Sequence, residues 1–187
     1  MSNYRLQLLS LFGLPASHPL PAHPDAAAPY WKDLYTNLRT ALHSDSLTQA
    51  EVYLLATALA HNAPHPTAQR ALAAMARRQE VSEEAIGAAV STANHMRANN
   101  ILFRYKHYLE PGDYDRLPAR LRFSREITQV LGKEPYELIC LAVSAVNGCS
   151  ACCRAHEQYL RRLDCPPERI FQAVRLASVL SSAFQLL

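Results

Sequence analysis

The chain has 187 residues, of which 49% are hydrophobic and only five are glycine. This length allows one domain with a substantial core, and the abundance of alanine and leucine favours helices, because these residues lose little conformational entropy in a helix. The formal net charge of +3 is small and the basic residues are scattered, which argues against a nucleic-acid-binding protein. Arg5 and Gln7 interrupt the apolar N-terminal stretch, so we expect neither a signal peptide nor a membrane span.

In chain order, the pattern predicts a short helix over residues 1–12 and then an extended, proline-rich strap up to Pro29. A helical pattern follows from Tyr30 almost to the end, and Thr48 and Glu51 have the spacing of a capping box that opens a helix. Residues 109–120 are expected to form the one clear interior loop. No segment has the alternation of apolar and polar residues that is typical of a strand, so the expected fold class is all-α. The other predicted helices cover residues 67–79, 83–104, 135–147, 150–163 and 167–187.

Two parts of the chain resemble each other. Residues 51–62 align with residues 137–148 at a constant offset, and residues 81–90 resemble residues 165–174. We interpret them as two degenerate helical repeats in a single domain, composed of an N-terminal helix and strap (1–29), a first copy (30–115) and a second copy (116–187). All cysteines lie in the second copy, which is therefore expected to carry the chemistry. This alignment pairs Cys149 with Ala63, Cys152 with Pro66 and His156 with Arg70.

The five cysteines all fall between Cys140 and Cys165. An odd number in a chain of this length does not suit a secreted disulfide framework, so a reducing compartment, the cytoplasm, is expected. In such a compartment a C-x-x-C motif is either a metal site or a working dithiol. One downstream histidine is too few to complete a closed zinc site, so we expect no bound metal.

The candidate site begins with a buried helix that ends in a turn. Residues 138–146 are apolar on nearly every face, and Asn147-Gly148 ends that helix because glycine tolerates the left-handed conformation. A new helix then begins near Cys149, with Cys149 and Cys152 in its first turn. There the unpaired backbone N–H groups and the helix dipole favour the reactive thiolate. We expect oxidation to join these two cysteines in a disulfide.

His156 and Glu137 complete the candidate site. His156 lies four residues after Cys152, on the same helical face, where it can exchange a proton with a thiol. If the chain reverses at Asn147-Gly148, the two helices run antiparallel and Glu137 comes back alongside His156, where a carboxylate would hold the imidazole in place. Two simpler interpretations stay open: Glu137 is a first-turn helix charge, and His156 is an exposed polar residue.

The other three cysteines are expected to have structural roles, and the other histidines are assigned no role. Cys140 lies in the middle of an apolar helix and is expected in the core. Cys153 points away from the face of the C-x-x-C pair and is expected to pack, and Cys165 is expected in a loop. No role is assigned to His61, His65, His95 and His107.

The combination Glu137-x11-Cys149-x2-Cys152-x3-His156 resembles the signature of the alkylhydroperoxidase D (AhpD) family, in the wider carboxymuconolactone decarboxylase-like superfamily. Residues 99–104, 108–118 and 30–34 also look like that family, so the resemblance covers the chain from Tyr30 to its end. It implies an all-helical, AhpD-like protein that is a homo-oligomer, a trimer or hexamer. It also implies that Cys152 attacks, that Cys149 resolves, and that Glu137 and His156 relay protons.

The same resemblance implies a thiol-dependent peroxidase in antioxidant defence. Such a protein reduces hydroperoxides weakly by itself and re-reduces an AhpC-type peroxiredoxin. It binds no cofactor and draws electrons from dihydrolipoamide on a lipoylated 2-oxoacid dehydrogenase component. This sequence departs from the family in having Ala151 where its best-known members carry a second histidine, and in its proline-rich strap.

Two alternative functions remain open from the sequence. One is a general disulfide reductase that never meets peroxide. The other is a non-catalytic helical oligomer whose cysteines are structural or sense oxidants.

Overall fold

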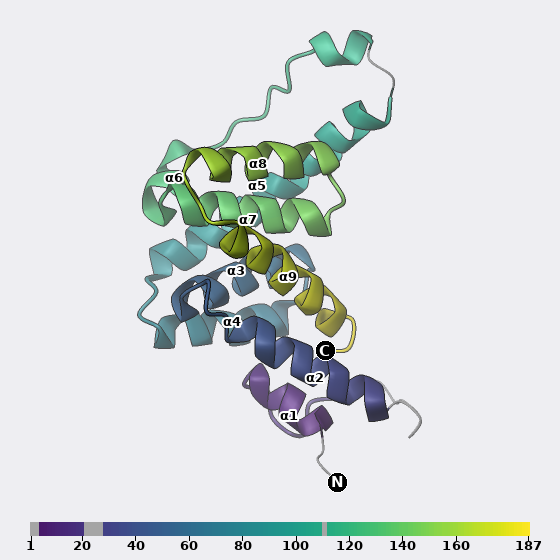
Figure 1. Cartoon of the computed structure of the whole chain (residues 1–187), viewed down its shortest axis with the longest axis vertical. Coiled ribbons are helices and arrows are strands. Elements are labelled where there is room, and N and C mark those ends of the chain that lie inside the picture. The colour runs from purple at the N-terminus through teal and green to yellow at the C-terminus, as the bar shows by residue number, and fades with distance from the viewer. Residues whose placement is uncertain (1–3, 21–27, 110–111) are drawn as a thin grey trace.

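The computed structural model describes residues 4–20, 28–109 and 112–187, and over these ranges it contains helices and no strand (Figure 1). The predicted all-α fold class is therefore confirmed. The elements are α1 (Tyr4–Leu11), α2 (Ala28–Leu42), α3 (Gln49–Asn62), α4 (Pro66–Arg78), α5 (Glu83–Tyr108), the 3-10 helix η2 (Asp113–Arg116), α6 (Arg125–Leu131), α7 (Lys133–Val146), α8 (Ser150–Arg162) and α9 (Pro167–Phe184).

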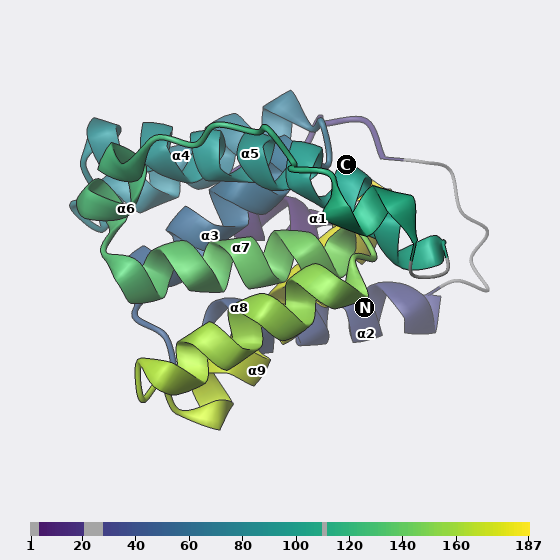
Figure 2. The same ribbon diagram turned by 90° about the horizontal axis from the view of Figure 1, so that it is seen from above.

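Helices α3 and α7 form the centre of the bundle because they are apolar on almost every side. Seven consecutive residues of α7, from Leu138 to Ser144, are buried, as are nine of the 14 residues of α3. The two helices pack on each other, and both also contact α5 and α9. The outer helix α4 pairs with α3, and α8 pairs with α7; in Figure 2 these last two helices meet at the turn that joins them and diverge away from it. A site at the end of α7 is thus held by the best-packed part of the molecule.

The capping box predicted at Thr48 is present and fixes the start of α3. The hydroxyl of Thr48 accepts a hydrogen bond from the N–H of Glu51 (3.2 Å), and the carboxylate of Glu51 accepts one from the N–H of Thr48 (2.8 Å). Two of the N–H groups that a helix start leaves unpaired are satisfied in this way.

The helices of the two predicted copies have corresponding starts, in a register that agrees with the alignment of residues 81–90 with 165–174 and differs by two residues from that of residues 51–62 with 137–148. Each of α7, α8 and α9 begins 84 residues after α3, α4 and α5 respectively, as Gln49 and Lys133 illustrate. The left-handed residues Glu80 and Asp164, which follow α4 and α8, also lie 84 residues apart. The sequence alignment of residues 51–62 with 137–148 used an offset of 86. It slipped by two residues because helices that are apolar all round match in several registers.

Other helix boundaries also differ from the sequence-based expectation. Pro29, assigned to the strap, lies in the first turn of α2, where its missing N–H costs no helical hydrogen bond. The separate helix α6 was not predicted; it ends and α7 begins around one residue, Gly132, with a φ of +80°. The predicted loop contains η2, and α5 runs four residues past its predicted end. Pro21 and Pro24 of the strap lie outside the described residues.

Candidate active site

The turn between α7 and α8 reverses the chain at Gly148, as the sequence predicts. Gly148 has a φ of +70°, in the left-handed region that favours glycine. The N–H of Gly148 donates to the carbonyl of Ala145 (3.1 Å), and the N–H of Cys149 donates to the carbonyl of Ser144 (3.0 Å). These bonds satisfy the last carbonyls of α7 and bring α8 back against it.

Cys149 and Cys152 occupy the first turn of α8 and are joined in a disulfide, with their Cα atoms 5.3 Å apart. Cys149 is the N-cap residue, and its sulfur accepts a hydrogen bond from the N–H of Cys152 (3.3 Å). Both cysteines are buried, with exposed fractions of 1% and 7%. The disulfide is therefore almost fully covered by protein, and it lies at the positive end of a helix dipole that favours a thiolate when the bond is reduced.

Glu137 and His156 meet across the two antiparallel helices. Nδ1 of His156 lies 2.7 Å from Oε2 of Glu137, and the two side chains are 19% and 13% exposed. In the neutral imidazole this contact places the proton on Nδ1, which leaves Nε2 as the basic nitrogen. The geometry therefore excludes the interpretation of His156 as a merely exposed polar residue. It also gives Glu137, in the second turn of α7, a specific partner.

The three remaining cysteines are free thiols, in the structural settings expected of them. Cys140 is buried in the core of α7, and burial, followed by the charge of Glu137, raises the pKa of its thiol. Cys153 is half-buried and packs against the core, and burial raises its pKa too. Cys165 lies in the loop before α9, and its pKa is also raised by burial. A raised pKa leaves these thiols mostly protonated and unreactive near neutral pH.

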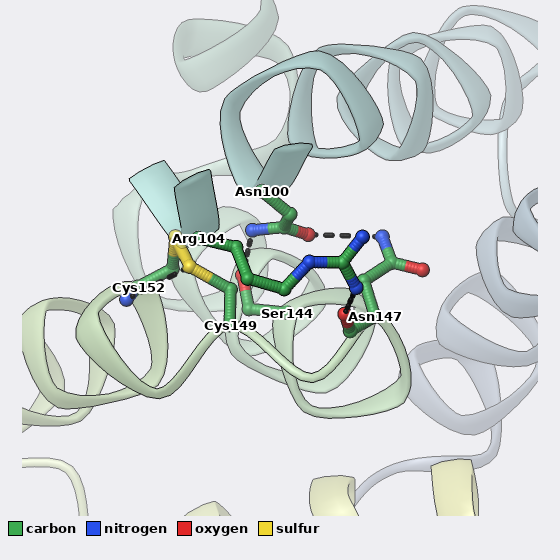
Figure 3. Close-up of a disulfide and its surroundings, with 6 residues drawn as sticks. All are labelled: Asn100, Arg104, Ser144, Asn147, Cys149 and Cys152. Atoms are coloured by element: carbon green, nitrogen blue, oxygen red, sulfur yellow. Dashed lines mark hydrogen bonds between the residues drawn. A yellow bond between two sulfur atoms is a disulfide. The ribbon is translucent and has the colours of Figure 1, made fainter. Parts of the chain in front are cut away.

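A network of side-chain amides surrounds the turn that presents Cys149, and it was not among the predicted site residues (Figure 3). The amide of Asn147 donates to the side-chain oxygens of Asn100 (2.9 Å) and Asn62 (3.2 Å), and Asn62 donates back to Asn147 (3.0 Å). Asn100 in turn donates to the hydroxyl of Ser144 (2.9 Å). The network ties together the C-terminal ends of α3 and α7 and the middle of α5.

Two arginines of α5 extend this network to the helix ends. Arg97 donates to the carbonyl of Asn62 (2.9 Å), the last residue of α3. Arg104 donates to the carbonyl of Asn147 (2.6 Å), the C-cap residue of α7. Cations are favourable at helix C-termini, where the carbonyls lack helical partners. Two sequence signals pointed here: an asparagine at the end of each central helix, and Asn100 and Arg104 within the segment that resembles the AhpD family.

The described part of the chain also bears on metal and membrane interactions. Within it, no three histidine, cysteine or carboxylate side chains are grouped so as to hold a metal ion. No helix among these residues is both long and apolar enough to cross a membrane.

Comparison with known proteins agrees with the site geometry. Residues 113–183 match the Carboxymuconolactone decarboxylase family. The chain is 39% identical over 160 residues to the alkyl hydroperoxide reductase AhpD of Mycolicibacterium smegmatis. This match covers 84% of this chain and 88% of that protein. It is 36% identical over 152 residues to the AhpD of an Anaeromyxobacter species, and this match covers 81% of each protein. It is 37% identical over 152 residues to the AhpD of Brucella canis, and this match covers 81% of this chain and 86% of that protein. At this identity and coverage, the chain belongs to the alkyl hydroperoxide reductase AhpD family.

Proposed function

We propose that this protein is a thiol-dependent alkyl hydroperoxide reductase that acts in antioxidant defence in the cytoplasm. The observation that carries the proposal is the Cys149–Cys152 disulfide on the first turn of α8, with His156 of the Glu137–His156 pair one turn further along the same helix. Relatives that share more than a third of the sequence are named for the same activity. A buried dithiol at a helix N-terminus suits two-electron chemistry, because it can alternate between two thiols and one disulfide without large movement.

In the proposed cycle, Cys152 attacks first and Cys149 resolves. The thiolate of Cys152 attacks the terminal oxygen of a hydroperoxide, which breaks the O–O bond and gives an alcohol and a sulfenic acid on Cys152. The thiol of Cys149 then attacks this sulfur, which forms the disulfide and releases water. One hydroperoxide and two thiols are thus converted to one alcohol, one water and one disulfide.

The Glu137–His156 pair would move the protons of this cycle. The carboxylate of Glu137 orients the imidazole, whose Nε2 can accept the proton of the attacking thiol and return it to the leaving alkoxide. Ala151 stands between the cysteines where the best-known members of the family carry a second histidine. His156 is accordingly the one imidazole assigned to the relay.

The proposed partners are those that the resemblance to the AhpD family implies. Dihydrolipoamide on a lipoylated 2-oxoacid dehydrogenase component would re-reduce the disulfide, with no bound cofactor. The reduced dithiol would in turn serve a hydroperoxide directly or re-reduce an AhpC-type peroxiredoxin. The active form would be a homo-oligomer, a trimer or hexamer.

The proposal is tested by dihydrolipoamide-driven consumption of cumene hydroperoxide. We expect turnover by the wild type, none by Cys152→Ser, and a single round of Cys152 oxidation without turnover by Cys149→Ser. Cys153→Ser is the matched control, because it changes an adjacent free thiol, and should turn over normally. If the wild type reduces disulfides with dihydrolipoamide but leaves the peroxide untouched, the protein is a general disulfide reductase. Full turnover by Cys149→Ser would favour a structural role for the cysteines.

A further inference from the structure

A polar cleft lies beside the turn that carries Cys149. It has a volume of about 160 Å³ and is lined by Arg97, Asn100, Ile101, Arg104 and Asn147; we call it the arginine cleft. The four lining residues from α5 follow one another at the spacing of a single helical face. Asn147, the fifth, is two residues from Cys149.

Among the residues that the structure describes, the two guanidinium groups of the cleft have no acidic partner. Each donates one hydrogen bond to a backbone carbonyl, although a guanidinium carries five N–H donors. In the described part of the chain, no carboxylate oxygen lies within 4.0 Å of either group. Arg169 shows the contrast, since Glu51 and Glu134 both pair with it.

The part of the sequence that begins with the cleft residues of α5 also carries an excess of positive charge. Between residues 97 and 125 the sequence has seven lysines and arginines against three acidic residues, an excess of four in a chain whose net charge is +3. Such a concentration of charge attracts anions over several ångströms and holds them where paired donors converge. Arginine matches carboxylate geometry well, because its planar fork can donate two parallel hydrogen bonds.

We propose that the arginine cleft binds a carboxylate of the dithiol substrate that reduces the Cys149–Cys152 disulfide. The inference rests on the proposed function, since it names the feature by which that function recognises its electron donor. The carboxylate belongs either to a small dithiol acid or to an acidic side chain next to a protein-bound dithiol. In both cases Arg97 and Arg104 anchor it while the thiols reach the sulfurs beyond Gly148.

The reduction itself is thiol–disulfide exchange. One substrate thiolate attacks a sulfur of the protein disulfide, which breaks the Cys149–Cys152 bond and forms a mixed disulfide and one protein thiolate. The second substrate thiol then attacks the mixed disulfide and releases the other protein sulfur. Two electrons and two protons pass from the dithiol to the protein, and the substrate leaves as its own disulfide.

The test compares dihydrolipoate with dihydrolipoamide, which carry the same dithiol but differ in a carboxylate. The rate of appearance of free Cys149 and Cys152 is measured after mixing each dithiol with oxidised protein. We expect dihydrolipoate to react faster, and we expect the ratio of the two rates to fall about tenfold in Arg104→Gln, as when one charge-assisted hydrogen bond is lost. Arg97→Gln should lower the same ratio and is the second variant, because Arg104 also holds the turn before Cys149. Structural damage would slow both dithiols equally and leave the ratio unchanged.

Arg39→Gln is the matched control, since it removes an exposed positive charge from α2, away from α5 in Figure 1, and should keep the wild-type ratio. A second arm uses a glutamate-rich peptide that carries dihydrolipoyl-lysine. Dependence on Arg97 and Arg104 with this peptide alone would assign the carboxylate to a protein donor. Equal rates for all dithiols in the wild type, or a ratio that neither arginine variant changes, would overturn the proposal.

Binding of oxidised lipoate and lipoamide, followed by calorimetry, separates this inference from the proposed function. Tighter binding of lipoate that weakens in Arg104→Gln supports the cleft even if neither dithiol reduces the protein. Reduction by both dithiols without any difference in binding would instead leave the proposed function standing and contradict the carboxylate site.

Discussion

At the scale of single residues, Gly148 fixes the position of the two cysteines, because its left-handed conformation turns the chain from α7 into α8. Gly148→Ala should destabilise the protein by about 1–2 kcal/mol, the cost of placing a Cβ in that conformation. Gly87→Ala is the control: Gly87 lies inside α5, an added Cβ there meets nothing within 4 Å, and alanine should stabilise the helix by up to about 1 kcal/mol. Urea denaturation of the two variants measures both effects. Equal stability of Gly148→Ala and the wild type would contradict the strained turn.

The free thiols should respond to pH in a way that reflects their burial. Because burial raises the pKa of Cys153, little thiolate is present near neutral pH, and its alkylation in the oxidised protein should be slow and should accelerate as pH rises. Cys140, more deeply buried, should stay unlabelled throughout. Peptide mapping after iodoacetamide treatment at several pH values checks this, with the unfolded protein as reference. Labelling of Cys153 at neutral pH as fast as in the unfolded chain would show that burial does not protect it.

At this scale the sequence predicts the local parts of the site and misses the tertiary ones. The Asn147-Gly148 turn, the position of Cys149 and Cys152 and the approach of Glu137 to His156 all follow from spacing within 20 residues of one another. The amide network joins residues as far apart as Asn62 and Asn147, 85 positions away. No periodicity in one chain segment specifies such a contact, because it depends on how α3, α5 and α7 pack.

At the scale of helices, the side chain of Arg169 links α9 to α3 and α7. It bonds Glu51 (2.6 Å), Glu134 (2.7 Å) and the carbonyl of Ser46 (2.7 Å). Arg169→Met should destabilise the protein by about 2 kcal/mol, less than for a fully buried ion pair because these groups keep some exposure. Arg161→Met is the control and should cost only about 0.3–0.5 kcal/mol, because it breaks an exposed pair with Glu157 within α8.

The Arg169 effect should also depend on pH. Burial alone would raise the pKa of Glu51, but the hydrogen bonds from Arg169 and Thr48 outweigh it and leave the pKa lowered. A lowered carboxyl pKa stabilises the folded state above the pKa of the unfolded chain, and this contribution disappears as pH falls through the folded value. The stability difference between wild type and Arg169→Met should therefore shrink in acid. A difference that stays constant from neutral to acidic pH would show that the ion pairs are not its source.

The helices themselves were largely predictable, as was the match of residues 81–90 with 165–174, but the register of the central helices α3 and α7 was not. Caps such as Thr48 and turns such as Gly148 mark helix ends in the sequence, so most boundaries fall within a few residues of the expected ones. The correspondence between α3 and α7 depends instead on which apolar residue faces which neighbour. In the observed register His65 is the counterpart of Cys149, since both are N-cap residues whose side chains accept a hydrogen bond from the N–H three residues on.

At the scale of the whole molecule, an apolar surface at one end predicts self-association. Large apolar side chains are exposed along the C-terminal half of α5 and the segment after it, which extend beyond the bundle in Figure 1. Tyr108 is 74% exposed and Leu117 is 56% exposed. Monomeric proteins seldom expose such patches, so this surface is expected to contact other copies of the chain. The residues of this surface are Phe103, Tyr105, Tyr108, Leu109, Tyr114, Leu117 and Leu121, while Ile101, also exposed, lines the arginine cleft.

We expect the wild type to sediment as an oligomer and Tyr108→Glu/Leu117→Glu to shift toward the monomer. Placing two charges in an apolar contact disfavours association because they lose their hydration there. Phe171→Glu on α9 is the control, since Phe171 is also exposed but lies outside this segment. Analytical ultracentrifugation at micromolar concentration measures the effect. A monomeric wild type would contradict the prediction.

The most direct test of the central claim is the rate at which the reduced protein reacts with a hydroperoxide, measured against pH for the wild type and His156→Gln. If the Glu137–His156 pair serves Cys152, the substitution should slow the reaction by about a hundredfold, the usual contribution of a general base, and abolish its pH dependence near neutrality. Glutamine keeps the hydrogen bond to Glu137 but does not titrate, so the fold should be preserved. A His156→Gln protein that reacts at the wild-type rate with the wild-type pH profile would contradict the proposed active site.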